Sequence, residues 1–125
     1  AYALAYYSKR LGFNELVDVG SGDGRLAYCS TLVGLKAFSI EIDCSLSLLQ
    51  HDISSLTGVS FEIYNTDATR FEYESLDLSC PIFFISGLPE CGDILARDVV
   101  AKEINSRNKK GAEFLLQAPE IRKGE

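Results

Sequence analysis

Three glycines at alternate positions, flanked by acidic residues, are the part of this chain best suited to bind a ligand. The run Asp18-Val19-Gly20-Ser21-Gly22-Asp23-Gly24 separates a short apolar stretch from an apolar periodic one. Glycine lets the backbone approach a ligand closely because no Cβ intervenes. A dinucleotide loop has the spacing G-x-G-x-x-G, which places a pyrophosphate at a helix N-terminus. Here the sixth position is Arg25, and the carboxylates of Asp18 and Asp23 would repel a pyrophosphate while tolerating a ligand with an amino group and a sulfonium.

A carboxylate at the end of the next predicted strand supplies a second part of such a site. Glu41 lies about 20 residues beyond the glycine run, where an acidic residue can reach a ribose. A ribose has two hydroxyl donors, and one carboxylate can accept from both. We therefore expect Glu41 to bind a ribose and Ile42 to contact the same ligand. Asp43, alone or with Ser45, is expected to cap the following helix. The alternative is that the acids only solvate the strand end.

Asp67 and Ala68 follow the third predicted strand and suit an adenine ring. Adenine has an exocyclic amine that needs an acceptor, and ring nitrogens that need a small neighbour with accessible backbone. Asp67 provides the acceptor and Ala68 the small neighbour. The alternative is an Asx-turn at Asp67 that only leads into the next segment.

These motifs resemble those of the class I S-adenosylmethionine (SAM)-dependent methyltransferases. The glycine run is similar to their acidic-x-G-x-G-x-G motif, and Asp67-Ala68 to their adenine-contacting pair. Ile40-Glu41-Ile42-Asp43 is similar to the I-E-I-D of many members, including rRNA adenine dimethyltransferases, in which the glutamate holds the ribose. The resemblance implies a three-layer α/β/α fold with a doubly wound parallel sheet in the order 3-2-1-4-5, and SAM as cofactor. It implies cofactor binding by Asp18, Gly20, Ser21, Gly22, Gly24, Glu41, Ile42, Asp67, Ala68 and Ser86.

The segment after the fourth predicted strand departs from the family pattern. Members that methylate base amines carry an N/D-P-P-Y/F sequence here, in which a polar group binds the target amine and an aromatic ring stacks on it. This chain has Ser86-Gly87-Leu88-Pro89-Glu90, so Ser86 occupies the polar position and is the candidate catalytic residue. No aromatic residue follows, and base stacking contributes about 1–3 kcal/mol, so a nucleobase acceptor is disfavoured. RNA, a protein side chain and a small molecule all remain open as acceptors.

The elements that would position these residues alternate between strand and helix patterns. Apolar or alternating runs predict strands at Glu15–Val19, Lys36–Ile42, Val59–Tyr64, Pro81–Ile85 and Glu113–Ala118. Helical periodicity predicts helices at Ala1–Leu11, Gly24–Val33, Ser45–Leu56 and Gly92–Asn108, and Arg70–Leu78 is expected to be a short helix or loop. In the third helix an apolar stripe is expected to face the core, formed by Leu46, Leu49, Ile53 and Leu56. The N-terminal tyrosines, Tyr2, Tyr6 and Tyr7, are expected to pack. The alternation predicts parallel strands with right-handed crossovers.

Length and composition indicate the number of domains and the redox environment of the protein. The chain has 125 residues, which suits one domain over residues 1–125, and it contains no Met, so we expect a fragment without the family's C-terminal antiparallel hairpin. Its four cysteines form no C-x-x-C pair and it has one histidine, which predicts no metal site and favours a reducing cytoplasm. No apolar run approaches the ~20 residues of a membrane helix.

The net charge of −6 argues against autonomous nucleic-acid binding. A nucleic-acid acceptor would need a further domain or a partner subunit. We favour a SAM-dependent methyltransferase or its cofactor-binding domain, which aligns a nucleophile with the methyl group and excludes water. The alternative is an inactive SAM-binding module or scaffold subunit. A nicotinamide-dependent oxidoreductase is disfavoured by Arg25 and the loop carboxylates.

Overall fold

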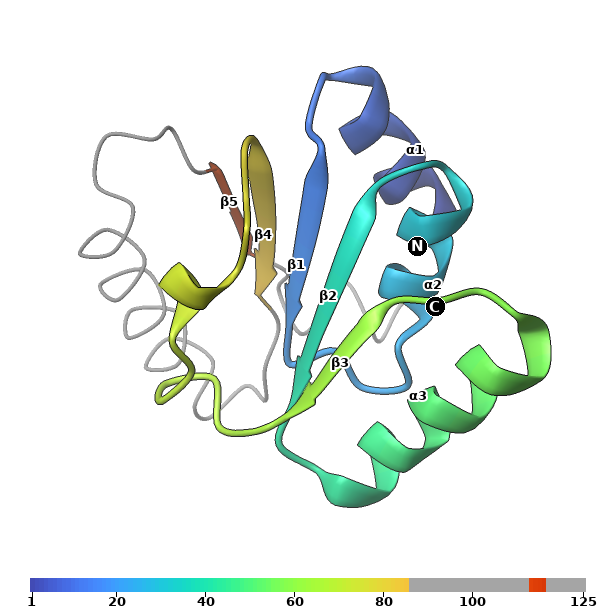
Figure 1. Cartoon of the computed structure of the whole chain (residues 1–125). Helices are drawn as coiled ribbons and strands as arrows, with labels where there is room; N and C mark the ends of the chain where they lie inside the picture. Colours follow the sequence, from blue (N-terminus) through green and yellow to red (C-terminus); the bar gives the residue numbers. More distant parts are fainter. Residues whose placement is uncertain (86–112, 117–125) are drawn as a thin grey trace.

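The computed structural model describes residues 1–85 and 113–116 as a parallel sheet with three helices on one face (Figure 1). The strands are β1 (Glu15–Val19), β2 (Lys36–Glu41), β3 (Glu62–Asn65), β4 (Pro81–Ile85) and β5 (Glu113–Leu116). The helices are α1 (Tyr2–Arg10), α2 (Arg25–Leu32) and α3 (Cys44–Thr57), with a 3₁₀ turn, η1 (Tyr73–Ser75). The five strands have the order β3-β2-β1-β4-β5 with parallel pairing throughout, which confirms the predicted sheet.

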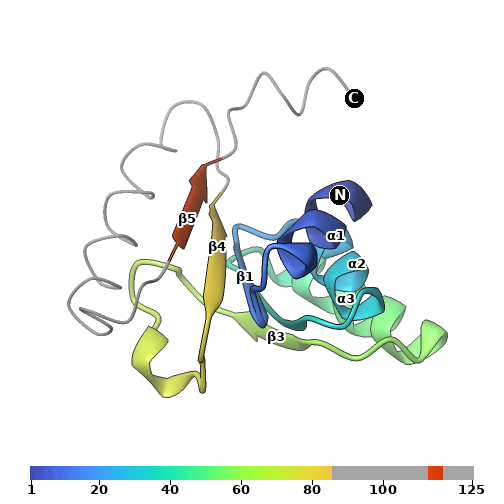
Figure 2. The same cartoon turned by 90° about the horizontal axis from the view of Figure 1, so that it is seen from above.

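The central strands of the sheet are covered on both faces. Every residue of β1 and of β4 is buried, as expected for parallel strands covered on both faces. Figure 2 shows α1, α2 and α3 on one side of the sheet and η1 with its flanking chain on the other. The predicted helix at 92–108, the residues 117–118 and the segment that begins at Ser86 lie outside the described residues.

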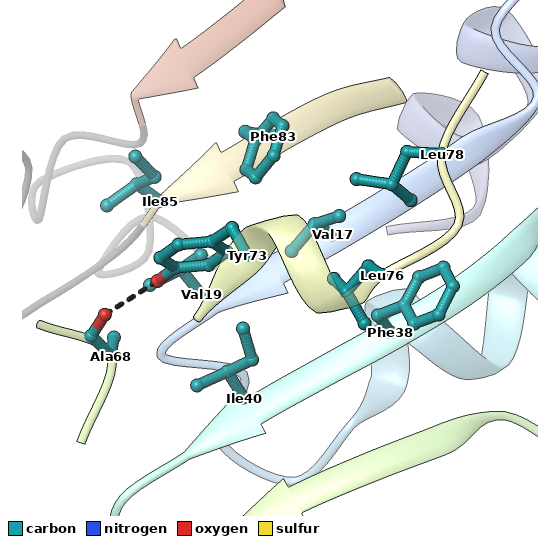
Figure 3. Packing of buried hydrophobic residues seen from close by; sticks show 10 residues of the cluster. All are labelled: Val17, Val19, Phe38, Ile40, Ala68, Tyr73, Leu76, Leu78, Phe83 and Ile85. Atoms are coloured by element: carbon teal, nitrogen blue, oxygen red, sulfur yellow. Dashed lines mark hydrogen bonds between the residues drawn. The ribbon is translucent and has the colours of Figure 1, made fainter. Parts of the chain in front are cut away.

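Side chains alternate between the two faces of the sheet. Val17 and Val19 of β1 and Phe83 of β4 point toward η1, where they pack on Tyr73 (Figure 3). Tyr73 is buried, and its hydroxyl donates to the carbonyl of Ala68 at 2.7 Å, which ties the chain after β3 onto the sheet. The alternate positions, including Asp18, face the helices.

The edge strand is shorter than predicted. β3 begins at Glu62 rather than Val59, because its pairing with β2 starts at Phe38↔Glu62. Phe61, just before it, is buried against Ala27 of α2 and Ala37 of β2 instead of lying in the sheet. The apolar character of Phe61 therefore comes from packing against α2 and β2 outside the strand pairing.

The expectation for the inward face of α3 was wrong. Leu49 and Leu56 are 42% and 86% exposed, whereas Ser47 and Gln50 are buried. Leu46 and Ile53 are half-buried. The helix turns a polar side inward because polar groups at the end of the sheet are available there as hydrogen-bond partners.

The N-terminal tyrosines also differ from expectation. Tyr2, Tyr6 and Tyr7 are exposed rather than packed into the core. Tyr6 stacks on Tyr2 and meets Tyr7 edge-on, so the three rings cluster on the outer side of α1. Across the described residues, no helix has both the length and the apolarity needed to cross a bilayer.

Candidate functional site

The turn from β1 to α2 is shaped by glycines at positive φ. Gly20, Gly22 and Gly24 have φ values of 76°, 64° and 85°, a region that other residues rarely adopt. Gly24 also makes a close approach, because a Cβ added there would lie 2.7 Å from the Cγ of Gln50 in α3. The predicted bend between sheet and helix is thus confirmed, with both conformational and packing reasons for its glycines.

Four backbone donors of this loop have partners within the protein. The N–H groups of Gly20 and Ser21 donate to the carbonyl of Ile40 at 2.9 and 3.2 Å. The Gly24 N–H donates to the carbonyl of Ser21 at 3.1 Å. The Gly22 N–H donates to Oε1 of Glu41 at 2.7 Å. Phosphate loops need such donors to point at the anion, so this loop is a poor phosphate site.

Glu41 joins the loop to the next strand-to-helix turn. Its side chain is buried, with Oε1 on Gly22 and Oε2 accepting from the Asp43 N–H at 3.0 Å. Its own carbonyl accepts from Nδ2 of Asn65 at 2.9 Å, which fixes the end of β2 against β3. Each carboxylate oxygen has a further lone pair, so the group can still accept from two hydroxyls.

Asp43 caps α3, as predicted. Its Oδ1 accepts from the N–H groups of Ser45 at 2.8 Å and Leu46 at 3.1 Å. These bonds satisfy first-turn donors that have no partner within the helix. The cap sets the direction in which the chain leaves Glu41.

Asp18 lies deep at the carboxyl end of β1. Burial raises its pKa from 3.8 to about 8, and the nearby carboxyls of Glu41 and Asp23 add to the shift. The carboxyl is therefore largely protonated in the free protein at neutral pH. Asp23 forms an exposed ion pair with Arg25 at 2.9 Å, and this partner lowers its pKa.

Two features of the structure reduce the repulsion of phosphate that we expected from Asp18 and Asp23. Asp18 carries little charge near neutral pH, and Arg25 offsets the charge of Asp23. The carboxylate that opposes a phosphate is Glu41, because it occupies the Gly22 donor directly. A phosphate at this loop would have to displace the Glu41 carboxylate from the Gly22 N–H.

Replacing Asp18 by Asn should remove a pH-dependent loss of stability. A raised folded-state pKa means that the folded protein binds this proton more tightly than the unfolded chain. The stabilising effect of the proton is complete below the unfolded-state pKa and is lost as pH rises toward 8. We expect the free energy of unfolding of wild type, relative to Asp18→Asn, to fall by about 1 kcal/mol between pH ~6 and pH ~7 in urea titrations. A constant difference between the two proteins over that range would contradict the buried, protonated carboxyl.

The expected adenine end lies where β2 and β3 finish side by side. Ile42 is 67% exposed directly after β2, and Asp67 follows β3, whose Asn65 pairs with Glu41. Oδ1 of Asp67 accepts from the N–H of Thr69 at 2.9 Å and from its hydroxyl at 2.8 Å, so the Asx-turn is present. Ala68 is buried beside it. Oδ2 of Asp67 lies 4.0 Å from Nε of Arg70, so both carboxylate oxygens have a partner within the protein. The contact of Asp67 with an adenine stays a prediction.

The sequence analysis missed Gln50, which is fully buried and bonded to the glycine loop. Ser39 was the available signal. It is a polar residue in the middle of an apolar strand, and buried hydroxyls need partners. Ser39 donates to Oε1 of Gln50 and shares a hydrogen bond with the hydroxyl of Ser21. Within the described residues, no group of three or more His, Cys, Asp and Glu side chains is placed to hold a metal ion.

Comparison with solved structures shows that the chain shares its fold with several methyltransferases. The CcbJ methyltransferase from Streptomyces caelestis superposes with a TM-score of 0.74 at 12% identity, over 92% of this chain and 47% of that one. An RNA methyltransferase from Salinibacter ruber, solved with S-adenosylhomocysteine (SAH), gives 0.61 at 20% identity, over 80% and 67%. The cyclase SpnF gives 0.63 at 18% identity, over 81% and 39%.

These likenesses concern the fold. The chain spans about half the length of the first of these structures. No family model matches the sequence, and no curated protein matches it either. SpnF is a cyclase, so the same fold also occurs in a protein that is not named as a methyltransferase.

Proposed function

We propose that this chain binds SAM at the carboxyl ends of β1, β2 and β3 and forms the cofactor-binding part of a methyltransferase. The observation that carries the proposal is the bond between Glu41 and the Gly22 N–H at 2.7 Å. It puts a carboxylate on the donor that a phosphate would use, and it holds that carboxylate at the strand end where a ribose is expected. An adenosyl ligand without phosphates suits this arrangement.

The proposed roles divide the cofactor into two ends. Glu41 accepts the ribose hydroxyls, exposed Ile42 contacts the adenine, and Asp67 with Ala68 binds the adenine edge. The amino-acid end lies against the glycine loop, formed by Asp18, Gly20, Ser21, Gly22 and Gly24. A positive amino group there would favour the ionised form of Asp18 and lower its raised pKa. Ser86 is proposed to orient the methyl acceptor.

The bound cofactor supplies an electrophilic methyl group on a sulfonium. The chain's own task is to hold the adenosine and exclude water while an acceptor is aligned. The acceptor is proposed to be RNA, a protein side chain or a small molecule. The I-E-I-D similarity supports RNA, whereas the missing aromatic residue after Ser86 argues against a nucleobase, so the three acceptors stay open. With a net charge of −6, an RNA acceptor would call for a further domain or subunit that binds it. We propose a cytoplasmic location, because the four cysteines are widely spaced and form no C-x-x-C pair.

Calorimetric titration with SAH and with NAD⁺ tests the proposal. SAH should bind at least about tenfold more tightly, which corresponds to about 1.4 kcal/mol. Equal or tighter binding of NAD⁺ would contradict a phosphate-free adenosyl site. Incubation with methyl-labelled SAM and a cell extract then separates the enzyme from the alternative, an inactive SAM-binding module, which the altered sequence at 86–90 favours. Label transfer to an acceptor would eliminate that alternative.

A further inference from the structure

Gln50 reaches from α3 into the core of the glycine loop. The side chain is fully buried, and its Nε2 donates to the carbonyl of Gly22 at 2.7 Å and to the hydroxyl of Ser21 at 2.9 Å. Its Oε1 accepts from the hydroxyl of Ser39 in β2. Both amide donors and the amide acceptor are therefore bonded, which is the condition under which a buried polar side chain is stable.

The loop is shaped to receive this side chain. Gly24 has no Cβ, and this leaves room for the side chain of Gln50. A Cβ at this position would lie 2.7 Å from Cγ of Gln50 and 2.9 Å from its Cδ. Ser21 and Ser39 are buried, and their hydroxyls also bond to each other. Loop, strand and helix thus meet at one amide group. Gln50, on the inward side of α3, therefore stabilises the loop through hydrogen bonds.

Gly22 is held from both sides. Its N–H is bonded to Glu41 and its carbonyl to Gln50. Because peptide groups are planar, these two bonds fix the orientation of the peptides before and after Gly22. Glycine would otherwise be the freest residue in the loop. Glu41 holds the Gly22 N–H from β2, whereas Gln50 holds the Gly22 carbonyl and the Ser21 hydroxyl from α3.

We infer that Gln50 is a positioning residue that holds the β1–α2 loop in the shape that receives the amino-acid end of the cofactor. The inference rests on the proposed function and assigns a role to a residue of α3 that does not itself reach the ligand. Loss of Gln50 should weaken binding of a ligand with an amino-acid end. It should spare a ligand that has only the adenosine end.

The variant Gln50→Met tests this, because it keeps side-chain length and removes both donors. We expect the Kd for SAH to rise by about tenfold, in line with the loss of two buried hydrogen bonds. The Kd for 5′-methylthioadenosine, which lacks the amino-acid end, should change by less than about threefold. Hydrogen exchange of the free protein should become faster at the amides of residues 20–24. A milder variant, Ser39→Ala, leaves Gln50 in place and should shift the same readouts in the same direction by less.

Ser54→Ala is the matched control. It also removes a polar contact of α3, the bond from its hydroxyl to the carbonyl of Val59 at 2.9 Å, but at the far end of the helix. It should leave both ligand affinities and loop exchange unchanged. Equal losses for both ligands in Gln50→Met, or unchanged exchange at 20–24, would overturn the inference. Failure of wild type to bind SAH would instead overturn the proposed function, and the exchange result would still show whether Gln50 holds the loop.

Discussion

Glu41→Ala should lower the affinity for SAH by about one to two orders of magnitude. Hydrogen bonds to charged groups contribute about 1.5–3 kcal/mol, and each 1.4 kcal/mol is a tenfold change in Kd. The substitution removes the proposed ribose acceptor and the bond that restrains Gly22. Isothermal titration with SAH measures the loss.

Glu62→Ala is the matched control for this prediction. Glu62 is an acid of the neighbouring strand that is exposed and pairs with Lys36 at 3.8 Å. It should leave the affinity within about twofold, because exposed ion pairs contribute little. Glu41→Ala also leaves the N–H groups of Gly22 and Asp43 unpaired, so urea unfolding should accompany each titration to identify the folded fraction. An unchanged Kd in folded Glu41→Ala would show that the ribose binds elsewhere.

Gly24→Ala should destabilise the protein by about 2–5 kcal/mol. The left-handed conformation costs other residues about 1–2 kcal/mol, and overpacking a core typically costs about 1–3 kcal/mol more. Both apply here, since φ is +85° and the new Cβ would lie 2.7 Å from Gln50. The free energy of unfolding from urea titration, followed by circular dichroism, measures the effect.

Gly58→Ala separates the two contributions. Gly58 ends α3 with φ 75° and ψ 5°, close to the φ 85° and ψ 11° of Gly24, but no atom lies within 4 Å of an added Cβ. It should cost only the conformational part, about 1–2 kcal/mol. In a Gln50→Ala background, Gly24→Ala should cost less than in wild type, because the clash is removed. Equal costs at both glycines in wild type would contradict the close approach of Gln50 to the loop.

The sheet could be predicted from sequence because its strands are strongly apolar and its turns contain glycine. β1 and β4 have the predicted bounds, and the order of the strands follows from the family resemblance. The start of β3 was predicted three residues too early, because Val59 to Phe61 alternate in hydrophobicity although they precede the pairing with β2. Phe61 packs on α2 and β2 instead. Alternating apolar residues indicate burial, but they do not by themselves show that a segment pairs with a neighbouring strand.

The glycine turn and the cap of α3 could be predicted from sequence, whereas the side chains that support the turn were missed. The loop after β1, Glu41 at the end of β2 and Asp67 after β3 can be located from the spacing of glycines and acids along the chain. The contact between Gln50 and Gly22 joins α3 to the first loop and depends on how the helix rolls on the sheet. The apolar stripe of α3 predicted the wrong rotation of the helix about its axis. The observed rotation turns Gln50 inward, where it joins a buried polar network around Ser39. The raised pKa of Asp18 likewise depends on burial by distant segments.

A crystal structure of the chain with SAH tests the central claim most directly. The account predicts both ribose hydroxyls within hydrogen-bond distance of the Glu41 carboxylate, with that carboxylate still on the Gly22 N–H. A ligand bound away from Glu41 would contradict it. So would an NAD⁺ complex in which phosphate oxygens replace Glu41 at the Gly22 N–H.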